Sequence, residues 1–217
     1  LSSANSKPRT VRRKPKKQNQ SSSFLKESPS PRFLFSLLPV QFSRMRMMVL
    51  NGVENFRDLG GYPCSYGETQ YGVIYRSATL AEATPQDKNK IADLGIKTIL
   101  DLRDDESRNK APSPFLHDPR FEVKELSVNG NGRISKDYED YLDSYMEMVE
   151  DPYTARRIFK AILESPKPLV IHCNAGKDRT GVFSALLLLF AGVPLEMVNA
   201  DYMMSFPLLP KMTQNTR

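Results

Sequence analysis

From about residue 49 onward, short apolar segments alternate with longer segments in which apolar residues recur every three or four positions. The short segments are rich in β-branched residues and have the length of β-strands. We expect strands at 73–75, 96–102, 121–128 and 168–171. The last of them is wholly apolar, as strands buried inside a parallel sheet are.

Five helices are expected between and after these strands. The first has the clearest boundaries, since Thr84 caps it, Pro85 takes its first position and Gly95 ends it. The polar, glycine-paired segment 55–61 is expected to be a turn. The other helices are expected at 138–149, 152–166, 180–192 and 194–204. Strands that alternate with helices form right-handed β-α-β units, so the expected fold class is α/β, with a parallel-rich central sheet flanked by helices.

Residues 1–48 differ in composition from the rest of the chain. They carry eleven Lys or Arg and one acid, Glu27, and they are rich in Ser and Pro. Such a segment cannot bury a core, so we expect a disordered tail. It is typical of an organelle transit peptide, but the chain begins with Leu1, and translation from a methionine within 45–48 would make the same residues an untranslated leader. Both interpretations stay open, and the folded domain is expected over 49–217.

The net charge of +6 belongs to this tail, because residues 49–217 carry 20 basic and 24 acidic side chains. A mildly acidic domain is not expected to bind nucleic acid. The only cysteines, Cys64 and Cys173, exclude a disulfide framework and indicate a reducing compartment, the cytoplasm unless the tail directs import. The longest apolar run, 182–193, is too short for a transmembrane segment.

The run 172–181, His-Cys-Asn-Ala-Gly-Lys-Asp-Arg-Thr-Gly, joins an apolar strand to a helix. A tight loop in this position directs successive backbone N–H groups inward, and the helix dipole adds to its attraction for phosphate. The same field stabilises the thiolate of Cys173, which is therefore the candidate nucleophile. Arg179 is separated from Cys173 by five residues, and it can hold two phosphate oxygens in a bidentate fork.

The other residues of the run are expected to support this chemistry. Gly176 and Gly181 let the backbone turn, Thr180 can hydrogen-bond the sulfur, and His172 is expected to shape the loop. The candidate phosphate-binding residues are Asn174, Ala175, Gly176, Lys177, Arg179, Thr180 and Gly181.

Covalent catalysis on a phosphate ester also needs an acid that protonates the leaving oxygen. Asp178, inside the loop, is the preferred candidate because it is the nearest to the nucleophile in sequence. An acid from a separate loop, Asp137 or Asp140, is the alternative. No metal and no cofactor are expected.

The loop resembles the signature of the protein tyrosine phosphatase superfamily, and it is most similar to the bacterial and fungal branch with a Lys-Asp-Arg loop. Further segments resemble motifs of that branch in the same order, namely 55–62, 75–78, 101–103 and 201–205. The resemblance covers about 51–206 and implies the cysteine-phosphatase fold with Asp178 as the acid. Because the family usually continues beyond Ser205, truncation at Arg217 stays open.

Several residues in these motifs have two interpretations. Arg57, Arg76 and Arg103 are either supporting residues of the site or ordinary surface charges and ion pairs. Asp58 and Asp101 are expected to orient backbone groups or arginines.

Two features outside the motifs are equally open. Cys64 is either a resolving thiol for oxidised Cys173 or an inert residue. The apolar stripe over 138–149 is either a mobile cover of the site or packed core.

The resemblance implies a phosphatase that hydrolyses phosphate monoesters through a phosphocysteine intermediate, with phosphotyrosine as the first substrate. Lys177 adds a second cation, which favours multiply charged groups, so phosphoinositides and phosphoserine or phosphothreonine are further candidates. The expected partner is thus a phosphorylated protein or a phosphoinositide, and the oligomeric state is unknown. A pseudophosphatase that binds phosphate without turnover is the alternative. A sulfurtransferase also uses a cysteine loop before a helix, but it would have no use for Asp178.

Overall fold

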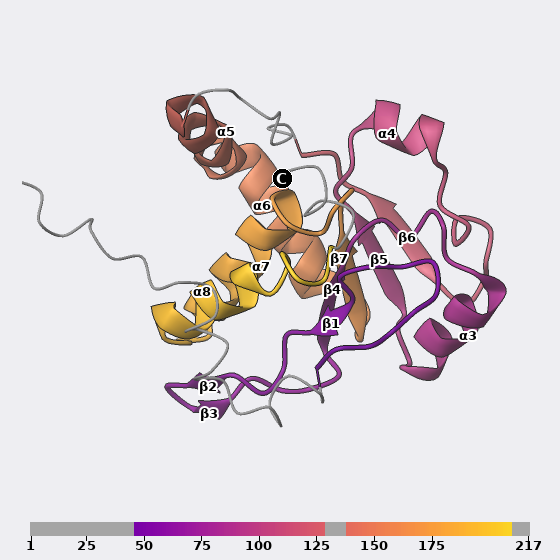
Figure 1. Ribbon diagram of the computed structural model, residues 1–217, viewed down its shortest axis with the longest axis horizontal. Coiled ribbons are helices and arrows are strands. Elements are labelled where there is room, and N and C mark those ends of the chain that lie inside the picture. The colour runs from indigo at the N-terminus through magenta and orange to yellow at the C-terminus, as the bar shows by residue number, and fades with distance from the viewer. Residues whose placement is uncertain (1–45, 129–137, 210–217) are drawn as a thin grey trace, which may run out of the picture. The chain divides into compact units, whose positions relative to one another are not determined.

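The computed structural model describes residues 46–128 and 138–209 (Figure 1). Its centre is a five-stranded sheet with the order β1-β4-β7-β5-β6. These strands are β1 Arg57–Asp58, β4 Ile74–Ser77, β5 Thr98–Asp101, β6 Glu122–Glu125 and β7 Leu169–His172. Strands β4, β7, β5 and β6 run parallel, whereas β1 pairs antiparallel with β4. The predicted parallel-rich sheet is confirmed, and the four predicted strands are present, with ends that differ from the prediction by one to three residues.

All five predicted helices are present, and the described residues contain one further helix that was not predicted. The helices are α3 Pro85–Asp93, α4 Asp105–Lys110, α5 Tyr138–Glu150, α6 Pro152–Glu164, α7 Arg179–Phe190 and α8 Leu195–Met203. The unpredicted helix α4 buries none of its six residues, so it leaves no apolar periodicity in the sequence. A small hairpin of β2 Pro63–Cys64 and β3 Gly67–Glu68 was also missed, and β1 lies inside the segment predicted to be a turn.

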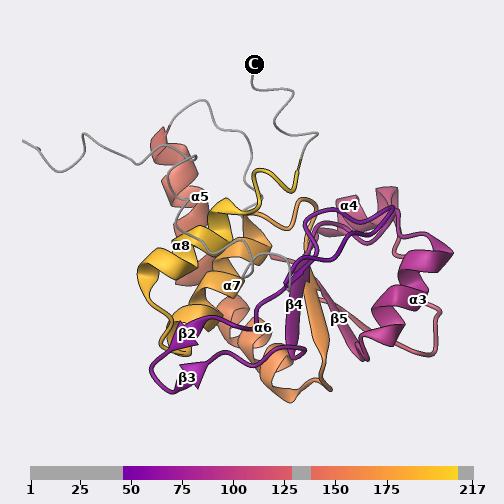
Figure 2. The ribbon, with the colours of Figure 1, turned by 60° about the horizontal axis from the view of Figure 1, so that its bottom comes forward.

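Helices cover both faces of the central sheet, with α3 on one side and α6 and α7 on the other (Figure 2). Successive residues of a strand point to opposite faces, and β5 illustrates the result. Ile99 packs in a cluster with Ile91 of α3, whereas Leu100 packs in another with Ile162 of α6 and Phe183 of α7. Each of these side chains is at most 1% exposed, and burying such a side chain contributes about 1.5–3 kcal/mol. Burial on both faces explains why the strands are almost wholly apolar.

The parallel register brings the motif segments to one edge of the sheet. His172 at the end of β7 lies opposite Ser77 of β4 and Asp101 of β5. The segments that follow these three residues therefore emerge together at the carboxyl ends of the strands, where open α/β sheets bind their ligands.

Candidate active site

The loop that follows β7 begins at Cys173 and ends at Asp178, the N-cap residue of α7. Cys173 is 3% exposed and Arg179 is 4% exposed. Within the part of the chain that the structure describes, the backbone N–H groups of residues 174–178 donate to no protein acceptor. A loop of unused donors that leads into a helix N-terminus is an anion-binding arrangement.

Two side chains from upstream segments hold the carbonyl groups of this loop. Asn55 Nδ2 donates to the carbonyl oxygens of Ala175 at 2.9 Å and Gly176 at 3.2 Å. Arg76 Nη2 donates to the same Gly176 oxygen at 2.6 Å. The C=O and N–H of one trans peptide group point in opposite directions. These contacts therefore turn the N–H groups of Gly176 and Lys177 away from Asn55 and Arg76.

Close packing of backbone requires glycine at Gly176. Its φ is +64°, and an added Cβ would lie 2.1 Å from the carbonyl oxygen of Ser77. Only glycine adopts this conformation without strain, and no residue with a Cβ fits against a backbone carbonyl so near. At Gly181 an added Cβ would meet the ring of Tyr202 at 2.7 Å. Both predicted glycine requirements thus have a structural basis.

A buried ion-pair network lies next to these anchors. Arg57 Nε lies 2.9 Å from Asp201 Oδ1 and Arg76 Nη1 lies 2.5 Å from Asp201 Oδ2. Both arginines are 0% exposed, so the interpretation of them as surface charges is wrong. Burial opposes the charge of Asp201, but attraction by the two guanidinium groups holds its pKa well below the usual range. Burial, with repulsion from Arg57, lowers the pKa of Arg76 to about 10.

The N-terminus of α4 holds both ends of the loop. Asp104 Oδ2 lies 3.1 Å from Arg179 Nη1, and Asp104 also caps α4 by accepting from the Ser107 N–H at 2.8 Å. Burial opposes the charge of Asp104, but the hydrogen bonds from Ser107 and Arg179 outweigh it and lower the pKa of this carboxyl. Asn174 Nδ2 donates to Ser107 Oγ at 3.2 Å. Asp104 was not among the predicted site residues, because its only signal in the sequence is its place directly after the Asp-Leu-Arg motif.

His172 is fully buried beside the nucleophile. Its Nδ1 lies 3.3 Å from the carbonyl oxygen of Cys173 and its Nε2 lies 3.6 Å from Asp101 Oδ2. Burial lowers the pKa of His172 although the charge of Asp101 opposes this shift. Arg103, which is 1% exposed, forms an ion pair with the same Asp101 at 2.7 Å. This arrangement ties His172 and Arg103 to the base of the loop, and the shaping role of His172 stays a prediction.

Other predicted supporting residues have different surroundings. Asp58 accepts from the N–H groups of Gly60 at 2.8 Å and Gly72 at 2.7 Å, so it orients backbone as expected. Thr180 is buried, and its Oγ1 has no hydrogen-bond partner among the described residues. The expected bond from Thr180 to the sulfur is therefore not formed in this structure. Cys64 is a partly exposed free thiol in β2, and neither of its two interpretations is tested.

The candidate acid Asp178 is surrounded by polar groups from three elements. Its Oδ1 accepts a hydrogen bond from the Tyr145 hydroxyl of α5, and it lies 3.4 Å from both Tyr202 Oη of α8 and Lys177 Nζ. The two tyrosine hydroxyl oxygens are 2.6 Å apart. Of the alternative acids, Asp137 lies outside the described residues, as does the side chain of Asp140.

The apolar stripe over 138–149 is divided between two roles. Met148 is buried in the core beneath α5, whereas Met146 is 43% exposed. The Tyr145 side chain is only partly buried, and its hydroxyl contacts the candidate acid. Packed core therefore describes only part of the stripe.

The sequence profile of the tyrosine phosphatase family matches residues 48–217. The chain belongs to this family. A tyrosine-protein phosphatase of Nostoc commune is 30% identical over 140 residues, which are 60% of this chain and 47% of the relative. This chain thus spans about half the length of that relative.

Two further comparisons are more distant. The triple specificity protein phosphatase PtpB of Mycobacterium tuberculosis is 24% identical over 206 residues, 77% of this chain and 72% of the relative. The crystal structure of the core catalytic domain of the PP-IP phosphatase SIW14 from S. cerevisiae, in complex with citrate, is 23% identical. It overlaps 73% of this chain and 80% of that chain with a TM-score of 0.41.

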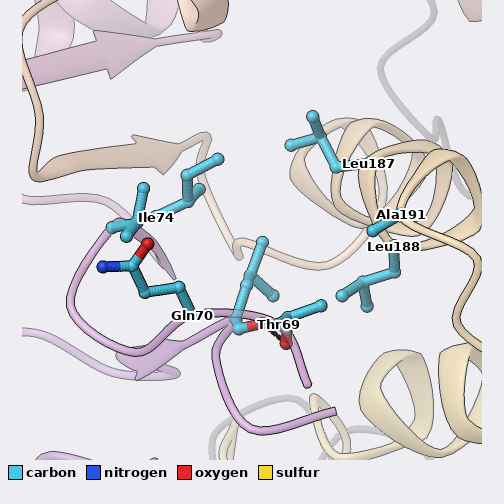
Figure 3. Close-up of a pocket in the computed structure, with 8 residues that line it drawn as sticks. Thr69, Gln70, Ile74, Leu187, Leu188 and Ala191 are labelled. Carbon is cyan, nitrogen blue, oxygen red and sulfur yellow. Dashed lines mark hydrogen bonds between the residues drawn. The ribbon is translucent and has the colours of Figure 1, made fainter. Parts of the chain in front are cut away.

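This tyrosine phosphatase family member also has an apolar pocket of about 240 Å³ away from the loop (Figure 3). Leu187 and Leu188 of α7, with Ala191 just after this helix, form one wall and face Thr69, Gln70 and Ile74 on the other. Apolar pockets are often the default candidates for active sites, but no titratable side chain lines this one. The lining of this pocket therefore offers no candidate acid or base.

Within the described ranges, no group of three or more His, Cys, Asp or Glu side chains is arranged to hold a metal ion. No helix found in those same ranges has both the length and the apolar character needed to cross a membrane.

Proposed function

We propose that the chain is a cysteine-dependent phosphatase that hydrolyses phosphate monoesters through a phosphocysteine intermediate. One observation carries the proposal: buried Cys173 and Arg179 flank a loop whose backbone N–H groups have no acceptor among the described protein groups. This combination offers a nucleophile and donors for the phosphate oxygens in one place.

The reaction has two steps. In the first, the Cys173 thiolate attacks phosphorus, the S–P bond forms as the bond to the leaving oxygen breaks, and Asp178 gives that oxygen its proton. In the second, Asp178 takes a proton from water, the water oxygen attacks phosphorus, and the S–P bond breaks to release phosphate and the thiolate. Arg179 and the loop amides hold the three equatorial oxygens throughout.

Phosphotyrosine is the proposed main substrate, in keeping with family membership. Lys177, whose side chain is 14% exposed, adds a cation within the loop and favours groups with several negative charges. The name of the mycobacterial relative, a triple specificity protein phosphatase, supports a substrate range wider than phosphotyrosine. Phosphoserine, phosphothreonine and phosphoinositides are the proposed further substrates. Both cysteines are free thiols, which fits a reducing compartment such as the cytoplasm.

The test is turnover of para-nitrophenyl phosphate by the full chain. Wild type and Cys64→Ser should both release nitrophenol, whereas Cys173→Ser should not, although it should still bind phosphorylated peptides. If the wild type binds such peptides without turnover, the chain is a pseudophosphatase and the proposal is wrong. A panel of phosphotyrosine peptides, phosphoserine peptides and phosphoinositide vesicles then ranks the substrates.

A further inference from the structure

The contacts of the candidate acid Asp178 are not shared between its two oxygens. The Tyr145 hydroxyl, Tyr202 Oη and Lys177 Nζ all approach Oδ1. Oδ2 has no partner among the residues that the structure describes. Although Asp178 is the N-cap residue of α7, its side chain accepts no capping hydrogen bond from the backbone. Its carboxyl group is therefore oriented by the two tyrosines and not by its own helix.

We propose that Tyr145 and Tyr202 are positioning residues for the proton transfer, holding Oδ1 of Asp178 so that Oδ2 carries the proton to the leaving oxygen. The inference rests on the proposed function, because it assigns a task to residues outside the loop only if Asp178 is the acid. As the bond from phosphorus to the leaving oxygen breaks, the proton on Oδ2 moves to that oxygen. Asp178 is left as a carboxylate that the tyrosine donors stabilise.

The hydroxyl protons define a chain that ends on the carboxyl group. Tyr145 donates its only hydroxyl proton to Asp178, and at 2.6 Å its oxygen is placed to accept from Tyr202. A hydroxyl group that accepts a hydrogen bond is polarised, and the hydrogen bond that it donates becomes stronger. Burial and the neighbouring Asp178 raise the pKa of Tyr145, and burial is the main cause that raises the pKa of Tyr202 to about 12. Both hydroxyls thus stay protonated, and remain donors, at any pH at which the enzyme would be assayed.

The experiment compares Tyr145→Phe and Tyr202→Phe with wild type and with Tyr66→Phe, a matched control whose side chain is 96% exposed. Phenylalanine keeps both rings, including the packing of the Tyr202 ring against Gly181. With an alkyl phosphate, which needs protonation of its leaving group, each of the two variants should lose about tenfold in kcat. With para-nitrophenyl phosphate the loss should be less than about threefold, because that leaving group is good.

The following results would support or overturn the inference on Tyr145 and Tyr202. Equal losses on both substrates overturn the inference. The double variant should lose little more than either single variant because the two hydroxyls act as one chain, and fully additive losses would contradict this. The rate of Cys173 alkylation by iodoacetamide should match wild type, which checks that the loop is intact. Absence of turnover in the wild type refutes the proposed function, whereas an active wild type with unaffected variants refutes only this inference.

Discussion

Arg76 and Asp201 form a buried ion pair in which Nη1 lies 2.5 Å from Oδ2. The other terminal nitrogen of the same guanidinium donates to the carbonyl oxygen of Gly176 at 2.6 Å. A single side chain of β4 therefore connects a carboxylate of α8 with the phosphate loop. The orientation of one loop peptide depends on a residue that follows it by 25 positions in the sequence.

Replacement of Asp201 by asparagine should destabilise the protein strongly. The change leaves Arg57 and Arg76 buried and close together without a counter-charge, and breaking a buried pair in this way costs about 3–5 kcal/mol. The free energy of unfolding from urea titration at pH 7 measures the effect. Glu106→Gln, which removes an exposed ion pair with Lys110, is the control and should leave the midpoint nearly unchanged. Equal stability of Asp201→Asn and wild type would contradict the structural role of the network.

Asp87 should stabilise the protein above about pH 4 and lose this contribution in acid. Burial opposes its charge, but hydrogen bonds from the N–H groups of Asn51, Gly52 and Thr84 lower its pKa to about 2. A carboxyl whose pKa is lower in the folded state stabilises that state above its unfolded pKa of about 3.9, and the stabilisation disappears as the pH falls through the folded value. At pH 6 the free energy of unfolding of the wild type should therefore exceed that of Asp87→Asn by about 1–2 kcal/mol.

The difference in the free energy of unfolding between wild type and Asp87→Asn should narrow below about pH 4 and nearly disappear near pH 2. Comparison with the variant is needed because Asp201, whose pKa is also lowered, loses stabilisation in the same direction. Urea titrations at pH 6, 4 and 2.5 measure the gap. A gap that stays constant with pH would show that the charge of Asp87 contributes nothing.

The parts of the fold and of the site that could be predicted from the sequence are those that depend on a local residue pattern. The strands, the longer helices and the anion-binding loop all leave a periodic or punctuated signal over a few residues. The interactions that place Asp178 and Arg179 do not, because Tyr145 precedes Asp178 by 33 positions and Asp104 precedes Arg179 by 75. Periodicity identifies which face of an element is buried, but it does not identify the distant residue that the face contacts. For the same reason the buried role of Arg57 was left open between two interpretations.

Asp104→Asn should separate phosphate affinity from turnover. Asparagine caps helices about as well as aspartate, so the hydrogen bond with the Ser107 N–H is kept. The charge that faces Arg179 at 3.1 Å is lost, so a phosphate no longer competes with a carboxylate for this guanidinium. The inhibition constant of inorganic phosphate should fall about threefold, while kcat falls because Arg179 loses a partner that fixes its orientation.

The matched control for Asp104 is Asp105→Asn in the same helix, whose side chain is 83% exposed and pairs with Arg108. Asp105→Asn should change neither the inhibition constant of phosphate nor kcat. Inhibition of para-nitrophenyl phosphate turnover by phosphate gives both values. A weaker affinity for phosphate in Asp104→Asn would mean that Asp104 supports binding and does not compete with it.

Gly176→Ala should abolish turnover while costing only modest stability, and Gly95→Ala provides the comparison. Both glycines have positive φ, +64° and +75°, so alanine pays a similar conformational cost of about 1 kcal/mol at either position. Their surroundings differ, because a Cβ at Gly176 would lie 2.1 Å from the Ser77 carbonyl oxygen, whereas at Gly95 the nearest atom is Pro168 Cδ at 3.9 Å. The loop must move in the first variant only, and a displacement of about 1 Å in a catalytic group reduces the rate on the order of 100-fold. We therefore expect Gly95→Ala to melt at a lower temperature than wild type and to keep full activity. We expect Gly176→Ala to lose at least about 100-fold in kcat/KM. Similar activity in the two variants would mean that the Ser77 contact does not fix the loop.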